Sequence, residues 1–473
     1  MNTKGREQVA SPTALDPAAL LRSPDYLKLL VFAAILGVPV SAAAYWFLYL
    51  VAHLQKWTYN ASYLPKWLGF SHVPVWWPLL PLAIAGVLVG LTVRYSPGAG
   101  GHSPADGFKA GAGPPTPVQL PGIVLAALAT LASGVVLGPE APLIALGAGL
   151  AFCAVRIAAK DAPPRTTMVV AATGSFAAIS ALLGSPIVGA FFLMEASGLG
   201  GPTLSLVLVP GLLASGIGYL IFIGLGSWTG HGTYALAILN LPHVGPPTAT
   251  EFLWAVAIGL IAAVLGTAIR WAGLVLRDRF DRRVVARTVV LAFVIGGLAI
   301  VFGQATSKSS SEVLFSGQSA LPSLVTGASS WSVGALLLLV VCKSAAYGAS
   351  LSSFRGGPTF PGMFIGAAGG IALSHLPGLR EIPGAAVGIG AMCTVMLGLP
   401  ITSVLLASVL MLSDGVVVMP LVIVGVVVAY VASARLARFL PASGRAAAMP
   451  RRTPERGHDE EAWPSQTEKT SAV

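Results

Sequence analysis

The sequence predicts an all-α polytopic membrane protein, one that crosses the bilayer many times. Apolar residues make up 55% of the 473 positions and charged residues only 10%, with a mean hydropathy of +0.80. Soluble globular domains carry about 25% charged residues, so this composition indicates a lipid environment. The chain also repeats its own Gly- and Pro-containing motifs, which indicates that the membrane part is duplicated.

Long, weakly charged apolar stretches recur along the chain and predict its helices. Some exceed the ~20 residues that a helix needs to cross a bilayer, and others are clearly shorter. Short stretches beside Gly and Pro are typical of discontinuous or re-entrant helices. A buried soluble core is the alternative, but it does not explain so many separate stretches. The stretches are 29–52, 76–93, 118–137, 141–155, 167–183, 203–225, 252–269, 288–303, 332–342, 384–398 and 400–429.

One carboxylate, that of Glu140, stands between two prolines in the apolar segment Gly138–Pro142. A bare charge in membrane sequence is costly and usually functional. The outline of this segment returns 219 residues later as Gly357–Pro361, and a Gly follows five residues after the second Pro in both copies. A second echo, 214 residues apart, relates Leu183–Pro186 to Leu397–Pro400. We therefore expect two repeats with broken helices at their centre.

The duplicated motifs and the distribution of charge predict the organisation of the chain. The ends are rich in Pro, Ser, Ala and charge, which is typical of disordered tails. A Gly-rich segment, Pro97–Pro117, contains too many glycines for a continuous helix. The predicted units are a tail at 1–27, a first membrane repeat at 28–225, a connecting loop at 226–250, a second membrane repeat at 251–438 and a tail at 439–473.

Basic residues cluster before residue 29, in the loop at 270–287 and between Arg435 and Arg456. The positive-inside rule assigns all three clusters to the cytoplasm, so we expect a multi-pass protein of the plasma (inner) membrane with both termini cytoplasmic. The first 28 residues do not have the form of a cleavable signal peptide. Because topology explains most of the net charge of +10, no nucleic-acid partner is expected.

The residues that carry enzyme and metal chemistry are scattered. Cys153, Cys342 and Cys393 lie in apolar sequence, and the seven histidines have no metal-ligand spacing. We therefore expect that the protein binds no metal or cofactor and is not an enzyme. The remote alternative is an integral-membrane enzyme, such as a lipid-modifying transferase or an intramembrane hydrolase. A cation or organic-solute transporter is a second alternative, which calls for more intramembrane acids than Glu140 and Glu195.

The paired segments have the composition of an anion site. Inverted repeats bring short broken helices together at the middle of the bilayer. The N-terminus of each such helix presents unpaired backbone N–H groups and the positive end of a dipole, which together attract anions. Gly138–Pro142 and Gly356–Pro361 both combine Gly and Pro with a short apolar helix, so an anion pathway is favoured over a cation pathway.

At these residues the chain resembles the CLC family of chloride channels and proton–chloride antiporters. Gly138–Pro142 is similar to the family segment G-(K/R)-E-G-P, and Gly357–Pro361 is similar to G-x-F-x-P. Gly100–Pro104 lies where G-S-G-I-P is expected, and the ordered match covers about 95–430. The resemblance implies about 18 helical segments, many of them tilted or broken, in an inverted repeat. No C-terminal regulatory domain is expected after the last apolar stretch.

The resemblance also implies a homodimer with one pore in each subunit and a gating glutamate in each pore. Gly184–Glu195 and Gly398–Val409 are similar to the two helices of the dimer interface. Glu140 matches the gating glutamate, whose carboxylate occupies an anion site and swings away on protonation. The anion-binding residues implied by the motifs are Gly101, His102, Ser103, Pro139, Glu140, Ala141, Thr359, Phe360 and, as a weak match for a pore tyrosine, Tyr430.

Several positions depart from the family pattern. Gly101 stands in place of the central anion-coordinating serine, with His102 and Ser103 as candidate substitutes. Thr359 replaces the family phenylalanine, which follows one position later as Phe360. Pro139 replaces the basic residue before the gating glutamate. These departures leave the selectivity open: chloride is the first expectation, a fluoride-selective exporter is the alternative, and nitrate is a further rival.

Proton coupling also stays open in the sequence. The proton-transfer glutamate of the family exchangers matches Ala196, while Glu195 matches the acid before it. The corresponding position of the second repeat is Val409. Glu195 is therefore a candidate either for a proton path or for a structural acid at a helix end. The expected function is transport of small anions through a pore gated by Glu140, by passive conduction or by proton-coupled antiport.

Overall fold

A computed structural model of the chain describes residues 22–107, 113–198, 202–238, 241–279 and 283–443, five of them (165, 202, 203, 205 and 413) through their backbone alone. These residues form sixteen α-helices and no β-strand, so the all-α prediction is confirmed. Most of the two predicted tails, 1–27 and 439–473, lies outside the described residues, although the first helix begins at Pro24, four residues earlier than expected.

The helices of the first half precede a long loop, which is described at 230–238 and 241–248. They are α2 (Pro24–Tyr59), α3 (Leu64–Trp67), α4 (Leu79–Tyr95), the 3-10 turns η1 (Pro97–Gly100) and η2 (Pro104–Asp106), α5 (Leu120–Ala132), α6 (Glu140–Ala158), α7 (Pro164–Leu183), α8 (Pro186–Ser197) and α9 (Pro202–Thr229).

The helices of the second half follow that loop. They are α10 (Ala249–Arg279), α11 (Val284–Thr306), η4 (Ser310–Glu312), α12 (Leu321–Thr326), η5 (Ala328–Ser330), α13 (Val333–Ser353), α14 (Thr359–Ser374), α15 (Glu381–Leu397), α16 (Pro400–Leu410), η6 (Leu412–Asp414), α17 (Gly415–Leu436) and η7 (Ala437–Phe439).

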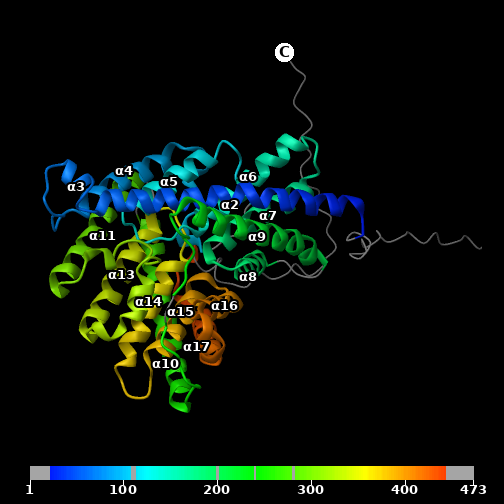
Figure 1. Cartoon of the computed structure of the whole chain (residues 1–473). Coiled ribbons are helices and arrows are strands. Elements are labelled where there is room, and N and C mark those ends of the chain that lie inside the picture. Colours follow the sequence, from blue (N-terminus) through cyan, green and yellow to red (C-terminus); the bar gives the residue numbers. More distant parts are fainter. Residues whose placement is uncertain (1–21, 108–112, 199–201, 239–240, 280–282, 444–473) are drawn as a thin grey trace, which may run out of the picture.

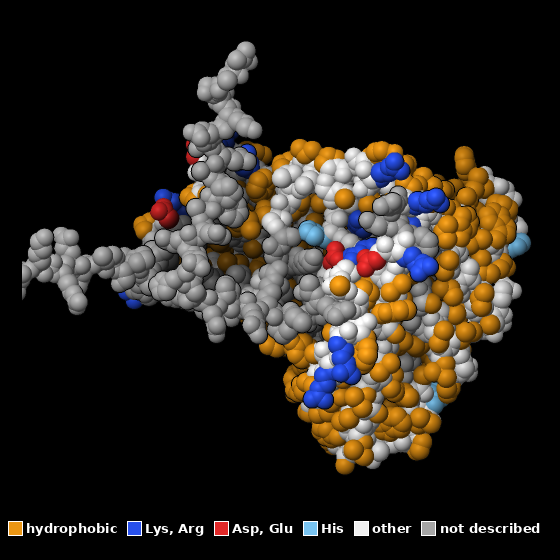
Figure 2. Space-filling view, turned by 180° about the vertical axis from the view of Figure 1, so that it is seen from behind, with side chains coloured by type: hydrophobic (Ala, Val, Ile, Leu, Met, Phe, Trp, Pro, Cys, Tyr) orange, Lys and Arg blue, Asp and Glu red, His pale blue; other side chains and the backbone are white. Residues whose placement is uncertain are grey.

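Helices long enough to cross a bilayer occur together with shorter apolar helices, as the apolar stretches of the sequence predicted. Within the described part of the chain, eight helices are long and apolar enough to cross a membrane, and six further apolar helices have only 10–17 residues. Large apolar side chains such as Ile35, Val290 and Val301 are exposed on the outer helices. Hydrophobic side chains cover large areas of the face in Figure 2, whereas Lys and Arg gather in a few places. This surface is suited to lipid.

The two halves pack their helices in corresponding pairs. In the first half α2 packs against α9 and α6 against α7; in the second, α10 packs against α17 and α14 against α15 (Figure 1).

The glycines that follow the two echoed motifs, Gly147 and Gly366, have the same role in helix packing. A Cβ atom on Gly147 would meet the carbonyl oxygen of Gly174, and one on Gly366 would meet that of Gly388. Glycine therefore permits a close helix contact at the corresponding place in each half.

Substituting Gly366 by Ala should loosen the α14–α15 pair. The added methyl group meets backbone atoms of Gly388, which cannot rotate away, and overpacking of this kind costs about 1–3 kcal/mol. Thermal unfolding of the purified protein in detergent measures the loss. Gly369→Ala on the same helix is the matched control, since nothing lies within 4 Å of its added Cβ. Equal stability of the two variants would contradict the packing argument.

Candidate functional site

Backbone hydrogen bonds join the two echoed segments directly. The Gly138 N–H donates to the Gly357 carbonyl oxygen at 2.8 Å, and the Gly357 N–H donates to the Gly138 carbonyl oxygen at 2.6 Å. This pair is an isolated antiparallel bridge, located two residues before α6 and two residues before α14. The bridge therefore brings the N-termini of the two helices together.

Helix α13 holds both segments from one side. The buried Tyr347 hydroxyl donates to the carbonyl oxygen of Pro358 at 2.7 Å. One turn along the helix, the hydroxyl oxygen of Ser350 accepts from the backbone N–H of Val136 at 3.2 Å. Tyr347 thus positions the start of α14, while Ser350 positions the strand-like segment that leads to Glu140.

The side chain of Glu140 lies between the two helix starts. It is 0% exposed, and its Oε1 accepts from the backbone N–H of Phe360 at 2.9 Å. A Cβ atom on Gly138 or Gly357 would collide with the carboxylate, so the paired glycines create the space that it fills. Within the described residues, Oε2 has no hydrogen-bond partner and no basic group lies within ion-pair distance.

The Glu140 carboxylate lies where two helix N-termini meet. The first turns of α6 and α14 leave backbone N–H groups without helical partners, and both helix dipoles point their positive ends at it. A small anion would need the same donors, so the carboxylate and an anion exclude each other. Neutralising the carboxyl group weakens its hold on these donors and makes them available.

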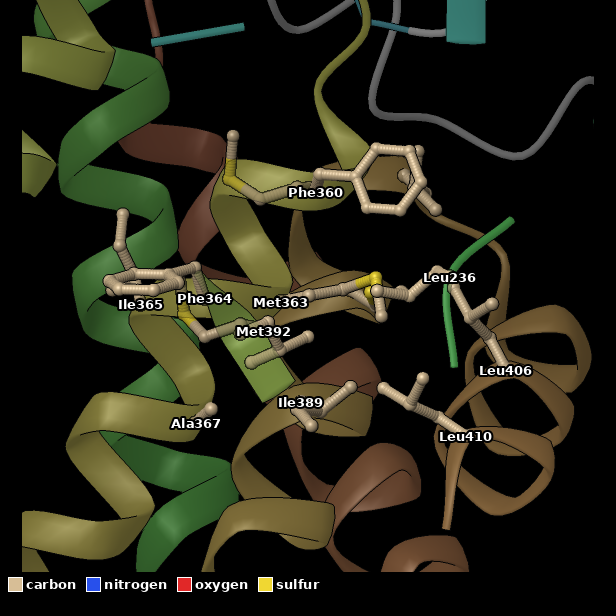
Figure 3. Close-up of a cluster of buried hydrophobic side chains, with 14 of the residues drawn as sticks. Leu236, Phe360, Met363, Phe364, Ile365, Ala367, Ile389, Met392, Leu406 and Leu410 are labelled. Carbon is tan, nitrogen blue, oxygen red and sulfur yellow. The ribbon is translucent and has the colours of Figure 1, made fainter. Parts of the chain in front are cut away.

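The remaining motif residues surround Glu140 in different ways. Pro139 is the N-cap residue of α6. Thr359 is buried, and its side chain and backbone lie against the Glu140 carboxylate. The Phe360 side chain belongs to a cluster of buried apolar residues that also contains Met363 and Leu406 (Figure 3), and its backbone N–H donates to Glu140. Position 360 therefore contributes its backbone N–H as a donor, and this donor does not depend on the identity of the side chain.

The Gly-rich segment forms two 3-10 turns between α4 and α5, and its described residues contain no α-helix, as its composition predicted. Gly98 and Gly101 have φ angles of +77° and +97°, a region that strongly favours glycine. The family serine would be strained at Gly101, which gives that departure a structural reason. Ser103 Oγ is buried without a hydrogen-bond partner among the described residues.

A cavity of about 370 Å³ lies beside this segment. It brings together Gly101, His102, Ser103 and Ala141, four of the residues predicted to bind an anion. The cavity reaches the first turn of α6 through Ala141 and the start of α14 through Pro358. The cavity therefore ends next to the buried Glu140 carboxylate.

Two predicted residues lie elsewhere. Tyr430 is on α17, which packs against α10, α15 and α16, and it is not among the residues that line the cavity. The Glu195 carboxylate lies at the N-terminus of α16, where it accepts from the Ile401 and Thr402 N–H groups at 3.0 and 2.8 Å and from the Thr402 hydroxyl. This contact is that of a helix cap and agrees with the structural role considered for Glu195.

Two residues of the site were missed in the sequence. Arg355 lines the cavity and could have been noticed as a basic residue directly before Gly356 in apolar sequence. Tyr347 carries no comparable pattern, because its role depends on the packing of α13 against α14. Among the described residues, no group of three or more His, Cys, Asp and Glu side chains could hold a metal ion.

Comparison with known proteins identifies the family. The sequence model of the voltage-gated chloride channel matches residues 82–434. The chain belongs to the voltage-gated chloride channel family. Its relatives in this family include YfeO, which is named as an ion-transport protein, from Escherichia coli (strain SMS-3-5 / SECEC) and from Escherichia fergusonii. Each is 30% identical over 318 residues, which is 66% of this chain and 72% of YfeO.

Solved structures of the CLC family share the fold. A slow cyanobacterial Cl⁻/H⁺ antiporter superposes with a TM-score of 0.69 at 19% identity, covering 86% of this chain and 94% of that one. A CLC-type fluoride/proton antiporter gives a TM-score of 0.64 at 18% identity, with coverage of 86% and 95%. The resemblance noted in the sequence is confirmed, and the chain is an anion transporter of the CLC family.

A double-mutant cycle can test whether the Glu140 carboxylate lies beside Gly138. Gly138→Ala should lower the unfolding temperature, because the three atoms nearest to the new Cβ all belong to the Glu140 carboxyl group, two of them at 2.6 Å. Glu140→Ala removes these atoms, so the same substitution should cost much less in that background. We expect a coupling of about 1–3 kcal/mol from thermal unfolding of the four proteins. An additive cycle would show that the carboxylate does not occupy this space.

Proposed function

We propose that this chain transports small monovalent anions along a path that runs from the 370 Å³ cavity past Glu140. The observation that carries the proposal is the buried Glu140 carboxylate between two helix N-termini, without a basic partner among the described residues. Helix ends supply N–H donors without a fixed cation, so an anion can enter and leave. Chloride is the first candidate ion, because the cyanobacterial protein of the same fold is a Cl⁻/H⁺ antiporter.

Fluoride is the second candidate, because one of the structures with this fold is a fluoride/proton antiporter. The departures at Gly101, Pro139 and Thr359 lie on the proposed path and would decide between the two ions. In this proposal Pro139 and Ala141 shape the first turn of α6, and Thr359 and Phe360 shape that of α14. Tyr430 is not part of the proposed path.

Passive conduction and proton-coupled antiport are two outcomes of one assay. The Glu195 carboxylate caps α16, so we assign it to stability and do not place it on a proton path. In the proposal, Glu140 is the acid whose protonation is linked to anion movement. Anion efflux and proton uptake, recorded together from liposomes, distinguish antiport, in which both move, from passive conduction.

Glu140→Gln should remove the pH response of anion flux. In the wild type, flux should rise as the pH falls, by up to about tenfold per pH unit, because protonation frees the N–H donors. Glutamine keeps the shape of the side chain without the charge, so flux should persist and become independent of pH. Liposome efflux of chloride and fluoride between pH 4 and pH 8, roughly the range of carboxyl and imidazole titration, measures this.

Glu195→Gln is the matched control for that experiment, since it neutralises a carboxyl group on α8 outside the cavity lining. It should keep the wild-type pH response. If Glu140→Gln also keeps it, Glu140 is not the gate. If neither chloride nor fluoride moves through the wild type, the transport proposal itself fails.

We further propose a homodimer in the plasma (inner) membrane with cytoplasmic termini. Ile187 on α8 and Ile401 on α16 are 60% and 51% exposed. Glu195 joins these two helices, so their apolar surface fits a second copy of the chain. The purified particle should have twice the protein mass of the 48.2 kDa chain.

The cytoplasmic orientation can be tested by chemical labelling. A cysteine introduced by Arg279→Cys, near the end of α10, should react with a membrane-impermeant thiol reagent only from the cytoplasmic side.

A further inference from the structure

The segment that leads to Glu140 is hydrogen-bonded to the second half of the chain at regular intervals. After α5 ends at Ala132, residues 133–139 form no helix. Three of them are held: Gly134 through its carbonyl oxygen, Val136 through its N–H and Gly138 through both backbone groups. Every second residue is therefore fixed, and Glu140 is the next residue in this series.

The first of these contacts is shared with α2. Tyr59 is the last residue of α2, and its hydroxyl donates to the Ser133 carbonyl oxygen at 2.5 Å. The neighbouring Gly134 carbonyl oxygen accepts from the Phe315 N–H at 3.0 Å. The Tyr59 and Phe315 rings meet edge to face, with 5.0 Å between their centroids. Two aromatic residues from opposite halves thus hold adjacent carbonyl oxygens just after α5, where no helical donor is available.

The backbone at this contact is unusual on both sides. Phe315 has a φ angle of +59° and Gly134 one of +99°, and a residue other than glycine rarely adopts a positive φ. Such a conformation persists only where its surroundings impose it. The buried Lys343 supplies this constraint, because its ammonium group donates to the carbonyl oxygens of residues 312–315. Gly134 also fits tightly, since a Cβ atom there would lie 2.7 Å from the Tyr59 hydroxyl oxygen.

We propose that Tyr59 and Phe315, which we call the α5 clamp, are positioning residues for Glu140. The clamp fixes the start of residues 133–139, so that the first turn of α6 keeps its place beside α14. The charged Glu140 carboxylate then stays on the Phe360 N–H and keeps the path closed. The inference rests on the proposed gate, and it adds the residues that hold the gate in position.

Tyr59→Phe tests the clamp, because it removes one hydroxyl group and keeps the ring. The Glu140 carboxylate should then leave its donors more readily, so anion flux from liposomes at pH 8 should rise about threefold, the scale of one hydrogen bond. Flux at pH 4, where the carboxyl group is protonated, should change little. Tyr63→Phe is the matched control: it removes the same group from a ring that is 41% exposed, and it should keep wild-type flux at both pH values.

The Glu140→Gln background separates positioning from a general packing role. Glutamine carries no charge that closes the path, so adding Tyr59→Phe should leave the flux of Glu140→Gln unchanged. An equal rise in both backgrounds would overturn the proposal, because it would not depend on the Glu140 charge. Wild-type flux at pH 8 in the single variant Tyr59→Phe would also overturn it.

Hydrogen exchange of the backbone gives a readout that does not depend on transport. In the purified full-length protein, the Val136 and Gly138 N–H groups should exchange faster in Tyr59→Phe than in the wild type or in Tyr63→Phe. Gly134→Ala is a second, independent variant, since its methyl group would displace the Tyr59 hydroxyl, and it should raise the exchange rate in the same way. Wild-type exchange in both variants would contradict the clamp.

The clamp and the gate fail separately in this design. If Glu140→Gln keeps the pH response but exchange of residues 134–138 depends on Tyr59, the clamp holds the segment and the gate proposal fails. If Glu140→Gln removes the pH response but neither exchange nor flux at pH 8 depends on Tyr59, the gate stands and the clamp is wrong.

Discussion

The structure depends on one short contact, the pair of backbone hydrogen bonds between Gly138 and Gly357. These bonds join segments 219 residues apart in the chain and place the N-termini of α6 and α14 side by side. Both positions must be glycine, because a Cβ atom on either would occupy the space of the Glu140 carboxylate. This one contact therefore sets both the arrangement of the two helix N-termini and the space that the Glu140 carboxylate fills.

Helix α13 supports this contact from behind. Tyr347 and Ser350 each hold one of the bridged segments. On the same helix the fully buried Lys343 donates to the carbonyl oxygens of residues 312–315, at 2.8–3.4 Å. The Phe315 N–H in turn donates to the Gly134 carbonyl oxygen. The residues before Glu140 are therefore fixed by hydrogen bonds to groups of the other half of the chain, which suits a site that must keep its donors in place while its occupant changes.

The two charges near the proposed path are held in similar ways. Among the residues described, the Glu140 carboxylate has a backbone donor and no ion-pair partner. The Arg355 guanidinium group donates to two backbone carbonyl oxygens, and Asp106 is the acid that interacts with it electrostatically, without a direct ion pair. Each is oriented by backbone groups. A charge that forms no direct ion pair responds to a mobile ion more readily than a charge bound to a fixed partner.

The sequence by itself determined the class of this protein and pointed to the centre of its candidate site. Composition predicted the membrane, the short spans predicted broken helices, and the echo of Gly138–Pro142 in Gly357–Pro361 predicted which segments would be paired. These features depend on local hydrophobicity and on the special backbones of Gly and Pro, which can be read position by position. Glu140 could be singled out because an isolated acid is conspicuous in apolar sequence.

Only the tertiary structure decided how the side chains are used. It assigned the Glu195 carboxylate to the N-terminus of α16, placed the Phe360 ring in the apolar cluster and left Tyr430 on α17, apart from the cavity. It also brought Arg355 to the cavity of Ser103 and gave Tyr347 its place at the start of α14. These roles depend on contacts between segments far apart in the chain, and local sequence patterns do not specify which distant backbone a side chain will meet.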